Sequence, residues 1–306
     1  MPLVEQKTST RVALDNVLFT TDFSPAAHAA LPYALAISRH YGSTLHTLHV
    51  IPEFDILVHP HGTTPGSFES AYEEERRGAL KRMRDLAPEL REVPHHNIRR
   101  GNVWDAVSEI IAEQHIDLLV IGTHGRSGLG KLLLGSVAEE LLRQAPCPVL
   151  TVGPKASTGI REEFDETAQD IVTDLELKQI IFAVDFNPES LAAAPFAISL
   201  AEEFQARLGL LYVIEHSEPH TSHLVRERLE NLVPEEAALW CRPETIVRFG
   251  VAAEKIVQAA RDCHADLIVL GVRAAKAHLS AATHFPWSTA HRVIAGAPCP
   301  VLTVRS

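Results

Sequence analysis

Short apolar runs alternate with longer segments of helical spacing along this chain. In the first half, runs that we expect to be buried strands lie near residues 16–21, 44–50, 95–99, 116–121 and 148–152. The segments between them carry apolar residues at helical spacing, as in 68–91, where Leu80, Met83, Leu86 and Leu90 share one face. Parallel strands joined by helical crossovers form a sheet that is covered on both faces. The pattern therefore predicts an α/β fold.

The chain also repeats itself, which predicts two domains. Residues 17–24 (VLFTTDFS) recur as 180–187 (IIFAVDFN), and residues 145–152 (APCPVLTV) recur unchanged as 297–304. We expect two tandem flavodoxin-like or Rossmann-like domains at 1–153 and 177–306, each with a five-stranded, mostly parallel sheet. Residues 154–176 contain Pro, Gly, Ser and several acids and have no counterpart in the second copy. This segment is expected to be a linker, with at most one helical turn near Phe164.

A glycine-rich stretch lies between the fourth strand and the next helix of the first copy. It reads Gly122-x2-Gly125-x9-Gly135-Ser136. Glycine lets the backbone N–H groups approach a ligand closely, and a helix N-terminus suits phosphate. Arg126 and Lys131 add positive charge to the same loop. The stretch is therefore the main candidate for a binding site.

Three interpretations of this loop compete. Gly125-x4-Gly130-Lys131 matches most of a P-loop, but Leu132 has no hydroxyl with which to hold Mg²⁺. A plain strand-to-helix turn would explain Ser136 as one half of a capping box with Glu139. The full glycine pattern, finally, resembles the ATP-binding signature of the universal stress protein family. We favour this third interpretation, because the pattern is long and its spacing is fixed.

The resemblance covers nearly the whole chain and implies a set of nucleotide-binding residues. Thr20, Asp22 and Val50 correspond to contacts on the adenine side, and Asp22 alone could instead stabilise the helix after it. The other residues implied by the resemblance contact ribose and phosphate, and they are Ile121, Gly122, Gly125, Arg126, Gly135, Ser136 and Val137. No metal ligand and no catalytic residue is assigned.

The second copy departs from the signature. Gly271 matches Gly122 and Ser288 matches Ser136, but Ala274 stands in place of Gly125 and Trp287 in place of Gly135. A bulky indole at a position of close backbone approach would block phosphate. The second site is therefore expected to be degenerate, with Trp287 either plugging the crevice or packing against the other domain.

Composition narrows the range of functions. The net charge of −11 disfavours a general nucleic-acid binder, and no apolar run approaches the length of a membrane span. The segment 1–11 is polar and lacks the apolar core of a secretory signal. Four cysteines without a CxxC pair fit a reducing cytoplasm, and Cys147 and Cys299, at the entry to strands, are expected to be buried structural thiols.

The leading hypothesis is a cytoplasmic stress-response regulatory protein that holds ATP or ADP, with or without Mg²⁺, in its first domain. The alternatives are a slow ATPase or self-phosphorylating enzyme, and a nucleotide-free scaffold for protein interactions. The protein partner is not specified by the sequence. Terminal strands often pair between domains in the family, so the two copies are expected to pair within the chain, and a homodimer is left open.

Overall fold

The computed structural model describes residues 12–52, 65–91, 93, 95–123, 134–165, 170–215, 221–273 and 288–305. The first half alternates strands with helices in the order β1 (Asn16–Thr20), α1 (Pro25–Tyr41), β2 (Thr44–Ile51), α3 (Pro65–Asp85), a 3₁₀ turn (Pro88–Arg91), β3 (His95–Arg100), α4 (Val103–Glu113), β4 (Leu118–Gly122), α5 (Ser136–Gln144) and β5 (Val149–Val152). The expected α/β class is therefore confirmed.

The second half repeats this order, but two of its helical crossovers are each divided into two shorter helices. Its elements are β8 (Gln179–Ala183), α6 (Pro188–Leu191), α7 (Ala194–Glu203), β9 (Arg207–Ile214), α8 (Thr221–Glu230), α9 (Glu235–Cys241), β10 (Pro243–Phe249), α10 (Ala252–Asp262), β11 (Leu267–Val272), α11 (Ser288–Gly296) and β12 (Val301–Arg305). The tandem repeat found in the sequence is thus a structural repeat.

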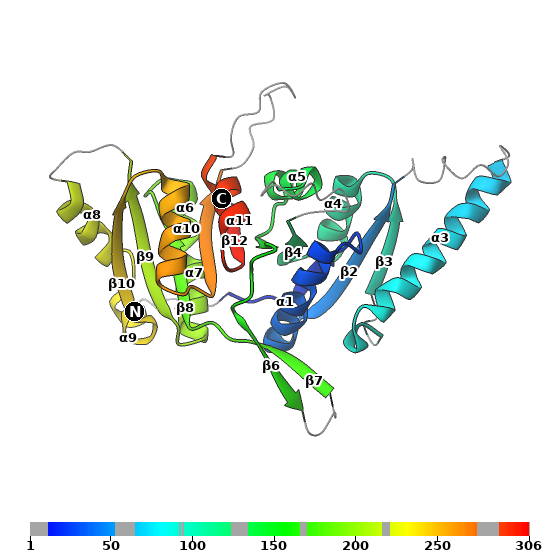
Figure 1. Ribbon diagram of the computed structural model, residues 1–306, viewed down its shortest axis with the longest axis horizontal. Helices are drawn as coiled ribbons and strands as arrows, with labels where there is room; N and C mark the ends of the chain where they lie inside the picture. The colour runs from blue at the N-terminus through cyan, green and yellow to red at the C-terminus, as the bar shows by residue number, and fades with distance from the viewer. Residues whose placement is uncertain are drawn as a thin grey trace, which may run out of the picture.

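One sheet runs through both halves. Its ten strands follow the order β10-β9-β8-β11-β12-β5-β4-β1-β2-β3, parallel within each half (Figure 1). At the joint, β12 pairs with β5 in the antiparallel sense, with Leu302 opposite Leu150. The two copies therefore pair within the chain through their last strands, as expected.

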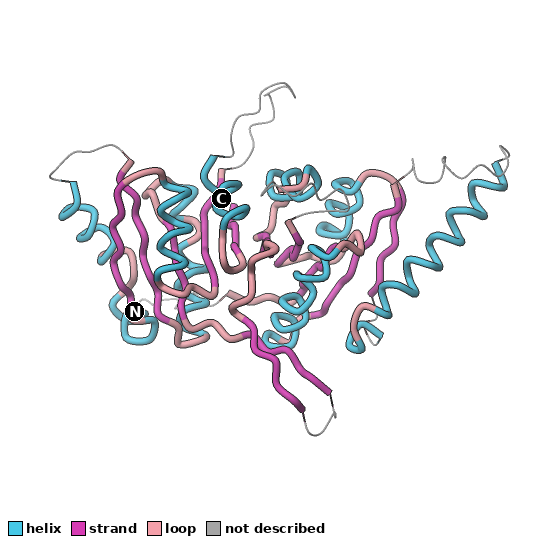
Figure 2. Tube along the Cα trace, in the orientation of Figure 1, coloured by secondary structure: helices cyan, strands magenta, loops and turns pink. Residues whose placement is uncertain are grey.

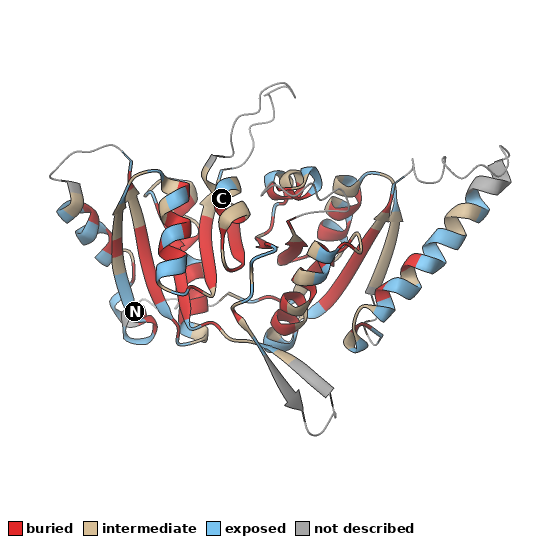
Figure 3. Ribbon diagram, viewed as in Figure 1, coloured by how far each residue is buried: buried red, intermediate tan, exposed pale blue. Residues whose placement is uncertain are grey.

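Two apolar layers sandwich this sheet, and both continue across the joint. On one face, residues of α1 and α7 pack with Leu150 and Leu302. On the other face, residues of α4, α5, α10 and α11 pack with Val149 and Val301. Neighbouring residues of a strand point to opposite faces, so the apolar runs of β5 and β12 serve both layers. The central strands are accordingly buried along most of their length (Figure 3).

The segment expected to be a linker forms a β-hairpin instead of containing a helical turn. Strand β6 (Ile160–Asp165) pairs antiparallel with β7 (Asp170–Leu175), so Phe164 lies in a strand and the expectation of a turn there was wrong (Figure 2). The run 171–173 (IVT) is β-branched, which favours a strand in spite of the acidic residues around it. The hydroxyl of Tyr33 in α1 donates to the carbonyl of Thr158 at 2.8 Å and ties the hairpin base to the first domain.

All four cysteines are free thiols, and Cys147 and Cys299 are 8% and 1% exposed, which confirms the expected burial. Burial raises the pKa of each of these two thiols to about 12. Cys263 is only partly buried. Among the described residues, no helix is long and apolar enough to span a bilayer, and no cluster of three or more His, Cys, Asp or Glu side chains could hold a metal.

This burial predicts an order of thiol reactivity. The thiolate is the reactive form, so a pKa near 12 leaves Cys147 and Cys299 protonated and inert at pH 8, whereas Cys263 is accessible and should be labelled first. Mass spectrometry of the native protein after timed treatment with an alkylating reagent measures this order. All four thiols should react in denaturant. Labelling of Cys147 or Cys299 as fast as Cys263 in the native protein would contradict the assigned burial.

Candidate functional site

The candidate site lies where the strand order of the first domain reverses. Strand β1 is flanked by β2 on one side and by β4 on the other, with Phe19 in register with Val120 (Figure 1). Helix α1, which follows β1, and helix α5, which follows β4, pack on opposite faces of the sheet. The crevice beyond the carboxyl ends of such strands is where open α/β sheets bind ligands. The adjacency of the first and fourth strands, which the resemblance implied, is confirmed.

A tight turn at the end of β1 positions Asp22. The Asp22 carboxylate accepts the N–H of Ser24 at 2.9 Å, and the Thr21 hydroxyl accepts the N–H of Phe23 at 2.9 Å. Ser24 then caps α1 by accepting the N–H of Ala27 at 3.2 Å. The alternative structural role considered for Asp22, stabilising the start of α1, is therefore real. The same turn places Asp22, which is half-buried, just beyond the carboxyl end of β1.

Phe23, which the sequence analysis did not single out, holds this turn in place. Its φ of 62° is left-handed, a conformation that is strained for a bulky side chain. The ring lies 4.5 Å from the ring of His49 in β2, and the Arg82 guanidinium of α3 lies over it at 4.4 Å. His49 in turn contacts the Thr21 carbonyl through Nδ1 at 2.8 Å. The contacts of the ring with His49 and Arg82 offset the strain of the backbone.

In the second domain, a phenylalanine at the equivalent position also contacts a ring and a guanidinium, supplied by other residues. Phe186 has a φ of 61°, its ring stacks on Tyr212 at 5.4 Å, and Arg228 lies over it at 3.9 Å. The Asp-Phe pair in both copies was the signal that could have revealed it. Because these ring contacts occur in both domains, we infer that they stabilise the turn.

Gly122 is required by packing. A Cβ built on it would lie 2.3 Å from the Ala26 carbonyl oxygen in the first turn of α1. Gly271 is in the same position in the second domain, where a Cβ would lie 2.0 Å from the Glu189 carbonyl oxygen. This close approach of helix to strand explains why the glycine persists in both copies. Gly271 by itself is therefore no sign of a second ligand site.

The ends of the glycine-rich loop are fastened together. The Thr123 N–H donates to Val152 in β5 at 3.1 Å, and the Gly135 N–H donates to the Thr123 carbonyl at 2.8 Å. The two ends of the loop therefore lie next to each other, just beyond the end of β4. Gly125, Arg126 and Lys131 lie outside the described residues.

Helix α5 begins without a side-chain cap among the described residues. The N-cap residue is Gly135, with φ −65° and ψ 149°, and the first helical bond runs from the Glu139 N–H to the Gly135 carbonyl at 2.9 Å. The capping box between Ser136 and Glu139, which the alternative interpretation as a plain turn invoked, is not formed, because the helix starts one residue earlier than that box requires. Ser136 and Val137 are exposed in the first turn.

The remaining expected site residues lie at the same edge of the sheet. Thr20 ends β1 opposite Leu48, and Val50 lies further along β2; both Thr20 and Val50 are half-buried. Ile121, by contrast, is 2% exposed and its side chain is part of the core beneath α4 and α5. Any ligand contact by Ile121 would have to use its main chain.

The second domain holds both ends of α5. The Leu134 N–H, just before the helix, contacts His291 Nε2 of α11 at 3.4 Å. At the other end, the Arg305 guanidinium donates to the carbonyls of Leu142, at 2.8 Å, and of Arg143. The residue equivalent to Arg305 in the first copy is Gly153, as the repeat of 145–152 at 297–304 shows. At the carboxyl end of the helix the support therefore runs one way, because Gly153 has no side chain with which the first domain could do the same for α11.

In the second domain, both carboxylate oxygens of Asp185 are hydrogen-bonded within the turn that follows β8. Its two carboxylate oxygens accept the main-chain and side-chain N–H groups of Asn187, at 3.0 and 2.8 Å. Helix α11 begins at Ser288 as α5 begins at Ser136, which supports the equivalence of the two positions. Ala274 and Trp287 lie outside the described residues, so the proposed indole plug stays a prediction.

Comparison with known proteins decides the family. The family model described as "Universal stress protein family" matches twice, at residues 13–153 and 176–305. The chain belongs to the universal stress protein family. It carries two domains of this family in tandem, in agreement with the resemblance found in the sequence.

Individual universal stress proteins support the same result. One from Methanocaldococcus jannaschii is 31% identical over 139 residues, covering 44% of this chain and 80% of the relative. One from Coxiella burnetii is 32% identical over 142 residues, covering 46% and 96%. The crystal structure of a universal stress protein from Archaeoglobus fulgidus superimposes with a TM-score of 0.66 at 19% identity, covering 95% of this chain and 98% of that one. This structural match shows the fold.

The role of the two matched glycines can be tested by adding one methyl group. Gly122→Ala and Gly271→Ala should each lower the free energy of unfolding by about 2–4 kcal/mol, because the strand and helix backbones must separate. Gly78→Ala is the matched control. It lies on the exposed side of α3 with open space around its Cα, and the change should leave stability unchanged or raise it by about 0.5–1 kcal/mol. Denaturant unfolding measures all three. Wild-type stability in Gly271→Ala would show that this glycine is not needed for packing.

Proposed function

We propose that this universal stress protein binds one adenine nucleotide, ATP or ADP, at the carboxyl edge of its first domain. The observation that carries the proposal is the N-terminus of α5, which begins at a glycine, at the switch point, with no side-chain cap among the described residues. This feature sits at the end of the glycine signature that the sequence supplies.

The two other helices of the domain whose N-caps the structure describes, α1 and α4, give this observation its weight. Helix α1 is capped by Ser24 and helix α4 by Asn102, whose side chain accepts the Asp105 N–H at 3.2 Å. The N–H groups of the first turn of a helix have no partner within the helix. A phosphate can accept them, and the positive end of the helix dipole favours its charge. In α5 the position that a capping side chain would occupy is therefore left for a ligand.

The rest of the nucleotide would extend toward the end of β1. Asp22, placed by its turn, and the main chain near Val50 lie on that side, where the resemblance assigns the adenine contacts. Gly125 and Arg126 would complete the phosphate end. We assign Ser136 and Val137 to phosphate through their N–H groups. Gly122 is required by packing, and its main-chain contact with the nucleotide stays a prediction.

The proposed role is regulatory, and the nucleotide would act as a signal held by the first domain. A solved universal stress protein has been determined in complex with cAMP, at 19% identity, a TM-score of 0.35 and with coverage of 42% of this chain and 97% of that one. Our proposal depends on the residues of this chain. The second domain, with Asp185 occupied by Asn187, would support α5 through Arg305 and His291 without binding nucleotide itself.

A capping side chain introduced at the N-terminus of α5 should compete with the nucleotide. Gly135→Asp fits the extended geometry of the N-cap and places a carboxylate on the N–H groups assigned to phosphate. We expect ATP affinity, measured by calorimetry, to fall at least about 100-fold while thermal stability stays equal or rises. Asn102→Asp is the matched control, because it adds the same charge at the closed cap of α4. It should change affinity less than about threefold.

A second variant separates backbone from hydroxyl contacts. Ser136→Pro removes the first N–H of the turn at a position where helices accept proline, and Gly135 already has the extended geometry that proline requires before it. Ser136→Ala removes the hydroxyl alone. We expect Ser136→Pro to weaken binding more than Ser136→Ala. Unchanged ATP affinity in both Gly135→Asp and Ser136→Pro, or no ATP binding by the wild-type protein, would overturn the proposal.

A further inference from the structure

We propose that the protein has a second ligand site, independent of the nucleotide site, in an apolar cavity between the two domains. The site fits one compact, uncharged molecule or group the size of a single aromatic ring. It lies over the β5–β12 joint on the face covered by α1 and α7.

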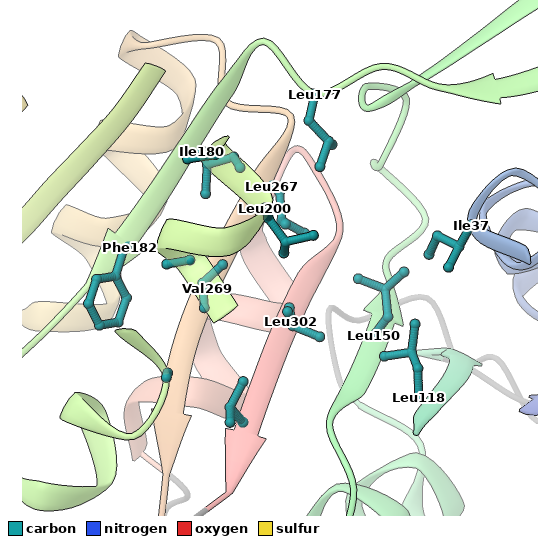
Figure 4. Packing of buried hydrophobic residues seen from close by; sticks show 14 of the residues in the cluster. Ile37, Leu118, Leu150, Leu177, Ile180, Phe182, Leu200, Leu267, Val269 and Leu302 are labelled. Carbon is teal, nitrogen blue, oxygen red and sulfur yellow. The ribbon is translucent and has the colours of Figure 1, made fainter. Parts of the chain in front are cut away.

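The architecture explains why a cavity exists at this place. Helix α1 lies over the strands of the first domain and helix α7 over those of the second, so the joint itself falls between two helices. Side chains from both domains face each other there, and Figure 4 shows six of them: Ile37, Leu118 and Leu150 from the first domain, and Leu200, Leu267 and Leu302 from the second. No helix fills the gap that they surround within the described part of the chain.

Two segments that precede equivalent strands also line the cavity. Val12 and Leu14 precede the first strand of the first domain, and Leu175 and Leu177 precede that of the second. Each pair lies just before the equivalent strand of its own repeat. The cavity is therefore built from matching parts of both copies, and a ligand in it would contact both domains at once.

The chemistry of the lining selects an apolar ligand. The surface that the described lining residues turn to the cavity is entirely apolar. Three lining residues, Tyr33, Tyr41 and Asp266, have polar side-chain groups. The Tyr33 hydroxyl donates to Thr158, and the Asp266 carboxylate accepts the N–H groups of Lys178 and Gln179 at 2.8 and 3.0 Å. Water in such a place lacks the polar partners that it requires. A ligand with hydrogen-bonding groups would lose its own hydration without replacement.

The size of the cavity limits the ligand. The centre of a water-sized sphere can move through about 50 Å³ of it, several times the ~10–15 Å³ needed for one water. This is room for a ring and too little for a long acyl chain. Tyr33, Tyr41 and Phe196 contribute aromatic rings to the wall, which favours an aromatic occupant through edge-to-face contact. We therefore commit to a single uncharged ring, with benzene as the probe.

Thermal unfolding of the full chain tests the site. Saturating benzene should raise the midpoint of the wild-type protein by roughly 2 °C or more, since a ligand that binds only the folded state stabilises it. Ile37→Phe and Leu200→Phe fill the cavity from its two sides and should abolish the shift. Leu35→Phe, on α1 but outside the lining, is the matched control and should keep it.

Methyl NMR of the wild-type protein gives a second reading that needs no variant. Benzene should shift the methyl signals of Leu150 and Leu302, and should leave those of Leu211 and Leu270, in the core on the opposite face, unchanged. The absence of any wild-type response to benzene would overturn the proposal. Equal responses on both faces, or an undiminished thermal shift in both filled variants, would overturn it as well. None of these readings depends on nucleotide binding.

Discussion

The antiparallel pairing of β5 with β12 is the contact on which the rest of the molecule depends. Each five-stranded sheet alone would end in an edge strand with unpaired N–H and C=O groups, a liability for any parallel sheet. Pairing the two edges satisfies those groups and makes both apolar layers continuous from one domain to the other. The same pairing brings the second domain against α5 and leaves the gap between α1 and α7 in which the apolar cavity forms.

The repeat was the most informative feature of the sequence. It predicted two equivalent domains, and the order of strands and helices in the structure repeats accordingly. The position of the candidate site followed from the topology, because strand ends and a glycine signature specify an edge of the sheet without any side-chain detail. These features are local or periodic, so a single sequence is enough to predict them.

Other features could not be predicted, because they depend on contacts between distant segments. The role of Gly122 is set by a helix turn that approaches it from residue 26, so a glycine demanded by packing looked the same as one demanded by a ligand. Ser136 and Glu139 have the spacing of a capping box, but the fastening of Gly135 to Thr123 starts the helix earlier. The hairpin at 160–175 was not predicted, because its acidic residues indicated an exposed linker. Its base is held by the hydrogen bond from Tyr33, a contact between segments that are far apart in the sequence.

The one-way support of α5 has a consequence for how such a protein could arise. In a symmetric pair of first domains, Gly153 would face each α5, and neither helix end would receive a guanidinium. Fusion into one chain removes the requirement that both partners stay identical, so a side chain can be added to one copy alone. The second copy can then lose its own glycine signature and be retained by selection for what it gives to its neighbour. In this protein Arg305 is such a side chain, present in the second copy where the first has Gly153.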